Sequence, residues 1–459
     1  MTKAPKSAGA IGGPQIGRRE ALLTGLGTGV VGAGLGVAVP QAALAFDGAD
    51  GRGIVPADGA VSQTATLQQA LNEAAASSTP LSLPAGTYKT GTLTLQAGTH
   101  VLGVPGRTIL KSDGPPILAI EDADNVRLSG LVLDGGGVAL GDGGALMTVS
   151  GATALDVSAC RFLNSGGGGM NLRKASGRIA QCTFGNIARE ALFSEDAAGL
   201  EIMNNHIHDC GDNGILVWRS EKGEDGTLVS GNRIERIAAK SGGSGQNGNG
   251  VNVFRAGSVL VTQNRISNCA FSAIRSNAGS NCQMVGNSCS RLGEVALYAE
   301  FGFEGALIAN NIVDTAATGI SVTNFNEGGR LAVVQGNIVR NLFFRKTGEA
   351  RGSGIAVEAD TTVTGNVVEG APAYGIIVGW GEYMRDVTVT GNVVRKSRIG
   401  IGVATASGAG AALITDNLID DAQDGAIRAM KGPTPTGPDL ALESAESFRN
   451  LAVYANVAR

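Results

Sequence analysis

Two glutamates, Glu300 and Glu358, hold equivalent places in a repeated apolar-x-apolar strand pattern, with one repeat between them. If each repeat pairs with its neighbour as a strand, their backbones lie about 9.6 Å apart, twice the ~4.8 Å strand spacing. That is near the upper edge of the roughly 6.5–9.5 Å between the carboxyl groups of inverting glycosidases. Arg275 and Tyr298 fall on the same face, where an arginine could neutralise a uronate carboxylate and a tyrosine could act as a base in lyase or epimerase chemistry. We therefore hypothesise that Glu300, Glu358, Tyr298 and Arg275 are catalytic.

The outward positions of neighbouring repeats carry further aromatic and charged residues. Aromatic rings beside arginines suit sugar rings that stack on a flat surface and sugar carboxylates that pair with guanidinium groups. These residues gather between Asn171 and Glu358, and the later repeats become bland at Ile377, Gly379 and Gly402. The alternative is an ordinary solvated surface with aromatics packed under long loops. The predicted substrate-binding residues are Arg173, Glu195, Trp218, Arg219, Asn252, Phe254, Arg255 and Asn277.

A second cluster combines two histidines with acidic neighbours. His206 and His208 alternate along one strand pattern beside Asp209 and Asp212, which suits a metal site or an acid/base pair. No histidine from a neighbouring repeat joins them, so a surface strand is the competing interpretation. The outward positions between Asn171 and Glu358 also lack the clustered aspartates of a calcium site. The sequence therefore predicts no cofactor and does not support calcium.

These residues are placed by a repeat of the form apolar-x-x-Asn-x-apolar. It runs from Ile202-x-x-Asn205-x-Ile207 to Ile414-x-x-Asn417-x-Ile419, with successive asparagines 23 to 32 residues apart. Cys182, Cys160 and Leu131 take the same place in three earlier copies. A period of this length indicates a solenoid, in which each repeat buries its apolar face only against its neighbours.

One repeat contains three short strand patterns, 228–230, 233–236 and 250–254. Three strands a turn, each paired with its copy in the next coil, predict an all-β parallel β-helix of about twelve coils. Asparagine tolerates the left-handed backbone region of a tight turn, and stacked amides can hydrogen-bond from coil to coil. The repeated asparagines are therefore predicted to be structural rather than part of an active site.

The two ends of the chain depart from the repeat. Residues 58–76 predict an amphipathic helix with Ser62 or Thr64 as its N-cap, which would cover the open end of the solenoid. At the other end, Pro433 to Pro438 predicts a loop, and 451–454 a capping strand. The expected segments are a signal peptide (1–45), an N-terminal cap with the first coils (46–125), β-helix repeats (126–430) and a C-terminal loop with a capping strand (431–459).

Composition and the N-terminus indicate export. Glycine accounts for 71 of 459 residues and charged residues for 17%, which is too apolar for disorder. Arg18-Arg19 precedes a weakly hydrophobic run, and Ala43-Leu44-Ala45 offers a cleavage site, as in twin-arginine signals; an N-terminal membrane anchor is the alternative. The expected partners are thus the twin-arginine translocase and signal peptidase, with no transmembrane segment after cleavage.

Charge excludes one class of partner. The remaining chain carries 32 basic and 39 acidic residues, which gives no electrostatic footprint for nucleic acid. The expected location is the periplasm or the exterior of the cell.

A helix followed by Leu83-Pro84-Ala85-Gly86-Thr87-Tyr88 and Gly-Asn-x-Ile/Val coils resembles the pectin-lyase-like right-handed β-helix superfamily over about residues 48–459. With Arg18-Arg19, the chain is similar to the twin-arginine-translocated β-helix repeat proteins. The resemblance implies a single-stranded right-handed β-helix with substrate along the strand after the long loop. We expect polysaccharide binding there, with lyase, hydrolase or epimerase activity left open. The alternative is a non-catalytic glycan-binding or structural scaffold of the cell envelope, so whether the protein is an enzyme also stays open.

Overall fold

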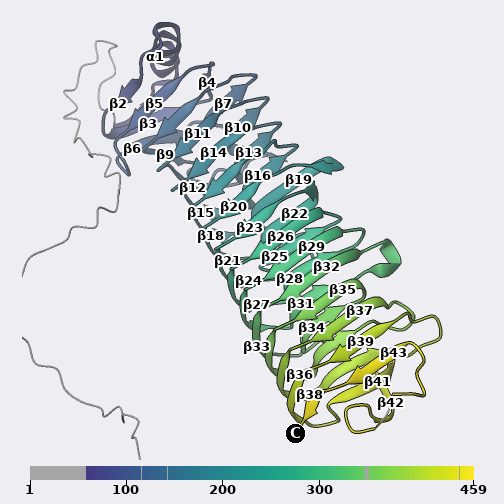
Figure 1. Ribbon diagram of the computed structural model, residues 1–459. Helices are drawn as coiled ribbons and strands as arrows, with labels where there is room; N and C mark the ends of the chain where they lie inside the picture. The colour runs from purple at the N-terminus through teal and green to yellow at the C-terminus, as the bar shows by residue number, and fades with distance from the viewer. Residues whose placement is uncertain (1–57, 115, 142, 347–350, 444) are drawn as a thin grey trace, which may run out of the picture. The chain divides into compact units, whose positions relative to one another are not determined.

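The computed structural model describes residues 58–114, 116–141, 143–346, 351–443 and 445–459. They form a parallel β-helix in which three strands per coil build three long sheets (Figure 1). About fifteen coils are present rather than the expected twelve. The difference arises because coils before Leu131 and after Asn417 lack the complete asparagine repeat that was counted in the sequence.

Each sheet collects one strand from every coil. The first sheet contains β2 (Leu81–Leu83), β5 (His100–Gly103), β8 (Arg127–Ser129), β11 (Leu155–Ser158), β14 (Gly177–Ala180), β17 (Glu201–Met203), β20 (Leu228–Ser230), β23 (Leu260–Thr262), β26 (Ser280–Val285), β29 (Glu304–Ala309), β32 (Arg330–Gln335), β35 (Ala359–Thr364), β37 (Arg385–Thr390), β39 (Ala412–Thr415) and β43 (Leu451–Tyr454).

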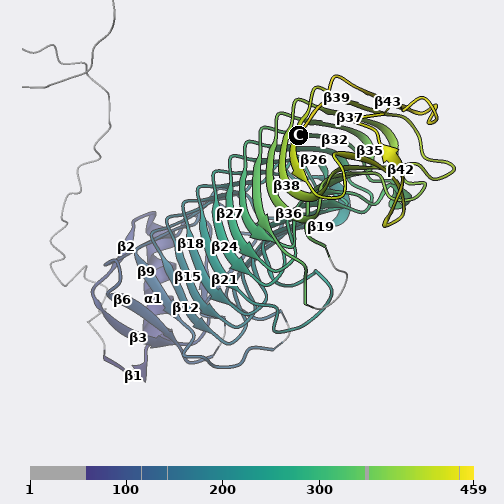
Figure 2. The same ribbon diagram turned by 90° about the horizontal axis from the view of Figure 1, so that it is seen from below.

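The second sheet contains β1 (Asp58–Ser62), β3 (Gly86–Thr90), β6 (Thr108–Ser112), β9 (Leu131–Asp134), β12 (Arg161–Ser165), β15 (Thr183–Ile187), β18 (His206–Cys210), β21 (Arg233–Ile237), β24 (Arg265–Cys269), β27 (Ser288–Leu292), β30 (Ile312–Ala316), β33 (Ile338–Leu342), the first halves of β36 (Val367–Val378) and β38 (Val393–Ala404), β40 (Leu418–Ala422) and β44 (Val457–Ala458). Figure 2 shows β12 to β27 side by side in chain order.

The third sheet, called the groove sheet below, contains β4 (Leu93–Leu95), β7 (Leu118–Glu121), β10 (Ala145–Ser150), β13 (Gly168–Arg173), β16 (Glu190–Glu195), β19 (Asn213–Glu224), β22 (Asn249–Gly257), β25 (Ile274–Asn277), β28 (Val295–Glu300), β31 (Thr318–Val322), β34 (Ser353–Val357), the second halves of β36 and β38, and β41 (Ile427–Lys431). Its strands pair in the expected register, so Trp218 lies beside Phe254 and Arg275 beside Tyr298.

Alternation along the strands separates core from surface. In β19 and β22, for example, Ile215, Val217, Val251 and Val253 are buried inside the coil. Successive residues of a strand point to opposite faces, so the residues between them point outward. The inward residues form one hydrophobic core from Leu67 in the N-terminal helix to the last coil.

A ladder of buried asparagines lines the turn between the first and second sheets. It runs from Asn205 to Asn456. Each member after Asn205 accepts two hydrogen bonds on Oδ1, from the backbone N–H and the Nδ2 of the asparagine one coil earlier. Oδ1 of Asn205 accepts from the backbone N–H of Cys182. At Asn287, for example, these distances from Asn264 are both 3.0 Å. Asn287 Nδ2 in turn donates to the carbonyl oxygen of Val261 at 2.9 Å. The prediction that the asparagines stack from coil to coil is confirmed.

The expected backbone role of these asparagines is wrong. The left-handed residue of the turn is the one before the ladder asparagine, for example Asn204, Gly231, Gln263 or Gly286, with φ between 55° and 69°. The role of the ladder asparagine therefore lies in its side-chain amide, which hydrogen-bonds to buried backbone groups of the turn that have no partner in a neighbouring strand.

The N-terminal cap is a helix, α1, over Thr64–Ser77, with buried Leu67, Ala70, Leu71 and Ala74 on one face. It lies at the end of the stack against β2 and β4 (Figure 1). The side chain of Gln68 exchanges two hydrogen bonds with the backbone of Thr94, at 2.8 and 2.9 Å, and so occupies part of an open strand edge. Residues 58–62, expected in the helix, form β1 instead, and neither Ser62 nor Thr64 caps α1.

The C-terminal segment also differs from the expectation. Residues 434–439, expected in a loop, form β42 (Thr434–Asp439), which pairs antiparallel with β41. Asp439 accepts hydrogen bonds from the N–H groups of Ala426, Ile427 and Ala441, which fixes this hairpin. Proline is tolerated here because β42 is an edge strand with no further partner among the described residues.

The described residues contain no helix of sufficient length and apolar character to span a membrane. The predicted signal peptide, residues 1–45, lies outside the described part of the chain.

We predict that Asn287→Ala lowers the free energy of unfolding by about 2–4 kcal/mol, because it leaves buried donors of Asn264 without acceptors. Thermal unfolding followed by circular dichroism measures the change. Ser288→Ala, at the adjacent exposed position, is the control and should change stability by less than about 0.5 kcal/mol. Equal stability of the two variants would contradict a structural role for the ladder.

Candidate functional site

A cavity of about 760 Å³ opens on the outer face of the groove sheet. Its floor is made by outward residues that the register aligns on consecutive coils, Tyr298, Ser321, Ala356 and Ile377. Its walls come mostly from residues outside this row: Phe344, Arg351, Glu358, Tyr374, Trp380, Arg398 and Pro433. The volume falls in the range of ~300–1,000 Å³ that is typical of small-ligand pockets. We call it the groove pocket.

Glu358 is the one carboxylate among the described residues that line the groove pocket. It follows β34 and is 9% exposed. The N–H of Phe325 donates to Oε2 of Glu358 at 2.7 Å, and Asn324, the residue before it, adopts a left-handed conformation that turns the chain toward the carboxylate. Burial raises the pKa of Glu358, and the backbone hydrogen bonds from Phe325 and Asn324 oppose this effect. A carboxyl group with a raised pKa suits proton donation.

Glu300, the second predicted catalytic carboxylate, does not line the groove pocket. Nη2 of Arg275 donates to Oε2 of Glu300 at 2.8 Å, Nε of Arg275 donates to Oε1, and Asn277 Nδ2 also donates to Oε1, at 3.0 Å. Burial raises the pKa of Glu300, while the charge and hydrogen bonds of Arg275 lower it. Glu300, Arg275 and Asn277 are thus engaged with one another, and Glu300 is not a free partner for Glu358 across the pocket.

Tyr298 lies in the groove pocket beside Thr323. The guanidinium of Arg275 sits over its ring, 5.1 Å from the centroid. Burial raises the pKa of Tyr298, so its phenol stays protonated at neutral pH. In this state Tyr298 is a hydrogen-bond donor rather than a base.

A buried charge network holds one wall of the groove pocket. Glu294 is 5% exposed and accepts a hydrogen bond from Arg345 at 3.0 Å and a longer one from Arg275 at 3.4 Å. Nη2 of Arg351 lies 4.0 Å from the same carboxylate. Because Arg345 directly follows Phe344 and Arg351 itself lines the groove pocket, Glu294 ties this wall to the groove sheet. Glu294 is not among the predicted site residues, because no local pattern distinguishes it from the other polar residues that precede groove strands.

The predicted binding residues of the earlier coils form a separate surface. Arg173 donates to Glu195 at 2.7 Å, so these two charges neutralise one another. Trp218 packs between Phe193 and Phe254, with ring centroids 5.4 and 5.3 Å away. None of these residues lines the groove pocket.

The polar residues around this aromatic row are partly occupied by the protein itself, whereas Trp218 Nε1, Arg219 Nε and Asn252 Oδ1 are buried without a hydrogen-bond partner among the described residues. Nη1 of Arg255 donates to the carbonyl oxygen of Ser220 at 3.0 Å, and its guanidinium lies over the ring of Phe254. Arg219 donates to the carbonyl oxygen of Ala197, and Asn252 to that of Gln246. The structure therefore brings together Trp218, Phe254 and Arg255 as a row on β19 and β22, which lie three and two coils from Tyr298 on β28.

Six wall residues of the groove pocket are not among the residues predicted from the sequence: Phe344, Arg351, Tyr374, Trp380, Arg398 and Pro433. The bland outward residues Ile377 and Gly379 line the groove pocket, although the prediction ends the polar and aromatic surface before them. Small residues on the strand leave space for the groove pocket above the sheet, and bulky residues from neighbouring loops form the walls that enclose this space. The sequence signal was the presence of Trp380 and Arg398 beside such a bland strand.

The histidine cluster lies on β18 of the second sheet. His206 Nε2 is 3.0 Å from Glu235, and His208 Nδ1 is 2.7 Å from Asp209. The hydrogen bonds from Arg236 lower the pKa of Asp209 to about 2. These side chains form hydrogen bonds on the surface, and within the described ranges no three His, Cys, Asp or Glu side chains are grouped to hold a metal ion.

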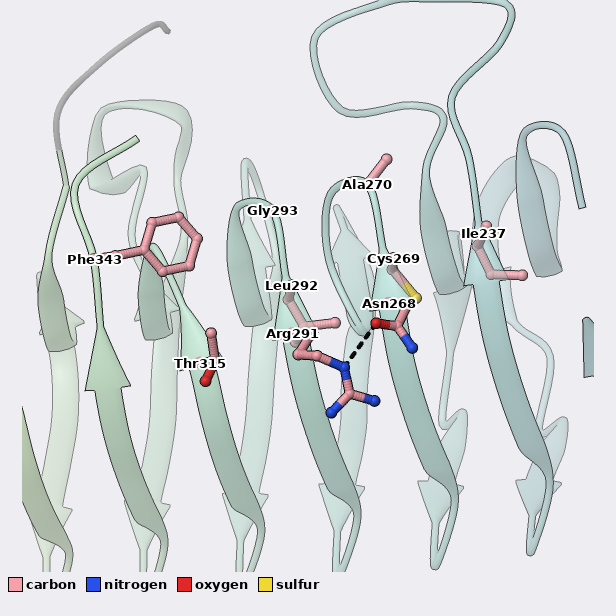
Figure 3. Close-up of a pocket in the computed structure, with 9 residues that line it drawn as sticks. All are labelled: Ile237, Asn268, Cys269, Ala270, Arg291, Leu292, Gly293, Thr315 and Phe343. Carbon is pink, nitrogen blue, oxygen red and sulfur yellow. Dashed lines mark hydrogen bonds between the residues drawn. The ribbon is translucent and has the colours of Figure 1, made fainter. Parts of the chain in front are cut away.

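A second hollow, of about 450 Å³, lies at the ends of second-sheet strands β21 to β33 (Figure 3). Its lining is mostly apolar, with Ile237, Cys269, Leu292 and Phe343. The hydrogen bond from Arg291 Nε to Asn268 Oδ1, 2.7 Å, crosses it. It contains no carboxylate or histidine, so it offers no acid or base.

We predict that the stability of the protein relative to Glu358→Gln falls as pH rises. Below the ordinary glutamate pKa, Glu358 is neutral in both the folded and unfolded states, so the two proteins should be alike. As pH rises through the raised pKa, the unfolded state ionises more readily and the wild type loses stability relative to the variant. Melting temperatures from pH 4 to 8 measure this, with Glu201→Gln, at an exposed position on β17, as the control. A pH-independent difference would contradict a raised pKa of the buried Glu358.

Comparison with known proteins agrees with this architecture. The family described as "Right handed beta helix region" matches residues 143–239 and 214–394, more than half of the chain. A search of curated proteins finds no match.

Several solved structures are similar to this chain. PfbA, a surface adhesin of Streptococcus pneumoniae, is 13% identical, with 84% of this chain and 93% of that chain covered and a TM-score of 0.44. The catalytic unit of a GH87 α-1,3-glucanase from Streptomyces thermodiastaticus is 15% identical, with 89% and 67% covered and a TM-score of 0.44. The A-module of the mannuronan C-5 epimerase AlgE4 of Azotobacter vinelandii is 16% identical, with 84% and 98% covered and a TM-score of 0.35. On the strength of the family match and the coil architecture, the chain belongs to the right-handed β-helix family.

Proposed function

We propose that this protein binds a polysaccharide in the groove pocket and that Glu358 transfers a proton to or from the bound sugar. The observation that carries the proposal is a cavity of about 760 Å³ that combines aromatic walls with one buried carboxyl group. Pockets for small ligands typically pair a largely apolar lining with a few placed polar groups.

The walls supply both kinds of contact that a sugar needs. Trp380 is 46% exposed and Phe344 48% exposed, so both rings offer surface to a ligand. Arg351 and Arg398 lie on the same cavity and bring positive charge to it, although each also lies near a carboxylate of the chain, Glu294 at 4.0 Å and Asp424 at 3.3 Å. A guanidinium group has five N–H donors, so one carboxylate does not use all of them and sugar oxygens can accept from the others. The row of Trp218, Phe254 and Arg255 lies farther along the same sheet, where a longer chain would pass.

Proton transfer is assigned to Glu358 because burial favours its neutral form and the amides of Phe325 and Asn324 orient it. The reaction class stays open among lyase, hydrolase and epimerase. Glu300 and Arg275 are assigned a structural role instead. Arg275, paired with Glu300, packs over the ring of Tyr298, and through its contact with Glu294 it supports the wall that carries Phe344 and Arg351.

A non-catalytic glycan-binding protein or envelope scaffold is the second candidate. One observation favours it: Glu358 is the single carboxylate in the described pocket lining, whereas glycoside hydrolysis commonly uses two. The two candidates share the binding site and differ in the role of Glu358.

We predict that Trp380→Ala lowers affinity for a glycan identified on a glycan array by about tenfold, because a stacking surface is lost. Glu358→Gln should keep affinity within about threefold and lower turnover by at least about 10²-fold, the usual contribution of a general acid or base. Product formation is followed by absorbance of unsaturated products or by new reducing ends, with exposed Tyr454→Ala as a control. Binding without products in the wild type would support the scaffold, and unchanged affinity of Trp380→Ala would contradict the pocket.

Export is proposed on the sequence alone. Arg18-Arg19 and Ala43-Leu44-Ala45 support passage through the twin-arginine translocase and cleavage by signal peptidase into the periplasm or beyond. Replacing both Arg18 and Arg19 by lysine should retain the protein in the cytoplasm, as measured by cell fractionation with the unchanged chain as control. Continued export of the double-lysine variant would contradict the route.

A further inference from the structure

One outward position of the second sheet changes character halfway along the coils. From β12 to β27 the position is polar, and from β30 onward it is always aliphatic. The register aligns Arg161, Thr183, His206, Arg233, Arg265 and Ser288 in the polar part, and Ile312, Ile338, Val367, Val393, Leu418 and Val457 in the aliphatic part. We call the second set the aliphatic stripe.

The aliphatic stripe is open to solvent. Ile312, Ile338, Val367 and Val457 are 40–48% exposed, and the other two members are half-buried. Isolated exposed apolar residues are ordinary, but a contiguous apolar patch with a polar border marks an interaction surface. Beside the stripe, the turn positions Gly336, Gly365 and Gly391 carry no side chain, so at these three coils no side chain from the turn covers the stripe.

A ladder of alternating charges borders the other side of the stripe, two residues farther along each strand. In coil order its members are Asp314, Arg340, Glu369, Arg395 and Asp420. Neighbours in the ladder form ion pairs: Arg340 with Asp314 at 2.7 Å, and Arg395 with Glu369 at 3.6 Å and Asp420 at 3.2 Å. We call this row the charge ladder.

We propose that the aliphatic stripe is a docking surface for a second copy of this chain. The two copies are related by a two-fold axis that runs parallel to the strands and passes between Val367 and Val393. Face to face, the coils then run in opposite directions, so Val367 meets Val393 of the other copy and Ile338 meets Leu418. A two-fold interface of this kind uses the same patch on both copies.

The charge ladder selects this arrangement. With the axis between two coils, Glu369 faces Arg395 of the other copy and Arg340 faces Asp420, so every facing pair has opposite charges. An axis through a coil would instead place Glu369 against Glu369, or Arg340 against Arg340, which is unfavourable. The central axis also covers all six members of the stripe.

The interface is small. Six coils span about 24 Å between the first and last strands. A patch of this length lies at the low end of specific protein interfaces, so the association is weak, with a dissociation constant in about the micromolar range or above. It lies on the second sheet, away from the groove pocket, and does not depend on the proposed glycan function.

The test is a charge swap on the full chain, followed by sedimentation equilibrium over a range of concentrations. Arg340→Glu alone and Asp420→Arg alone each place like charges face to face, and each should weaken self-association by at least about tenfold. The double variant, Arg340→Glu with Asp420→Arg, should restore association to within about threefold of the wild type. Within one chain these two positions are three coils, or about 14 Å, apart, so the rescue can come only from contact between copies.

A second pair of variants tests the stripe itself. Ile338→Arg should abolish association, whereas Thr183→Arg, at the same position in the polar part, should leave it unchanged. The proposal is overturned if the wild type is monomeric up to about 100 µM, a concentration that populates even weak dimers. It is also overturned if the double swap fails to rescue association, or if the chain is monomeric and Ile338→Arg removes binding to an insoluble polysaccharide, which would assign the stripe to that polymer.

Discussion

The register between neighbouring coils is the constraint on which the rest of the structure depends. From Asn232 to Asn456, each ladder asparagine accepts hydrogen bonds from the backbone N–H and the side-chain amide of the preceding one, and so locks one coil to the next at the same turn. Because side chains alternate along a strand, a slip of one residue would expose the inner valines and isoleucines of every strand that followed. The ladder thus fixes which residues reach each face.

Both surfaces with functional interest follow from that register. On the groove sheet it places Tyr298, Ser321, Ala356 and Ile377 in one row, which becomes the floor of the groove pocket. On the second sheet the same spacing turns single exposed aliphatic residues into a continuous stripe. In a solenoid, the residue type at one repeat position recurs in each coil at a fixed distance, so a preference at that position produces a continuous surface.

Charge in the candidate site is arranged in two layers. Glu300 and Glu294 are paired with arginines in the interior of the wall, while Glu358 accepts hydrogen bonds from the backbone amides of Phe325 and Asn324. An unpaired arginine or glutamate in the wall would be costly to bury, so the ion pairs stabilise the scaffold rather than present free charge. The contrast explains why two similar glutamates on one sheet differ in chemical availability.

The sequence by itself determined the solenoid, the three strands per coil, the inward and outward faces and the relative register of Glu300, Thr323 and Glu358. These features follow from local alternation and a repeat, which are properties of the chain alone. Only the tertiary structure decided that Arg275 pairs with Glu300, and that Phe344, Arg351, Tyr374 and Arg398 close a pocket above Ile377 and Gly379. Those contacts depend on how loops of different lengths fold over the sheet, and no repeat fixes the path of a loop.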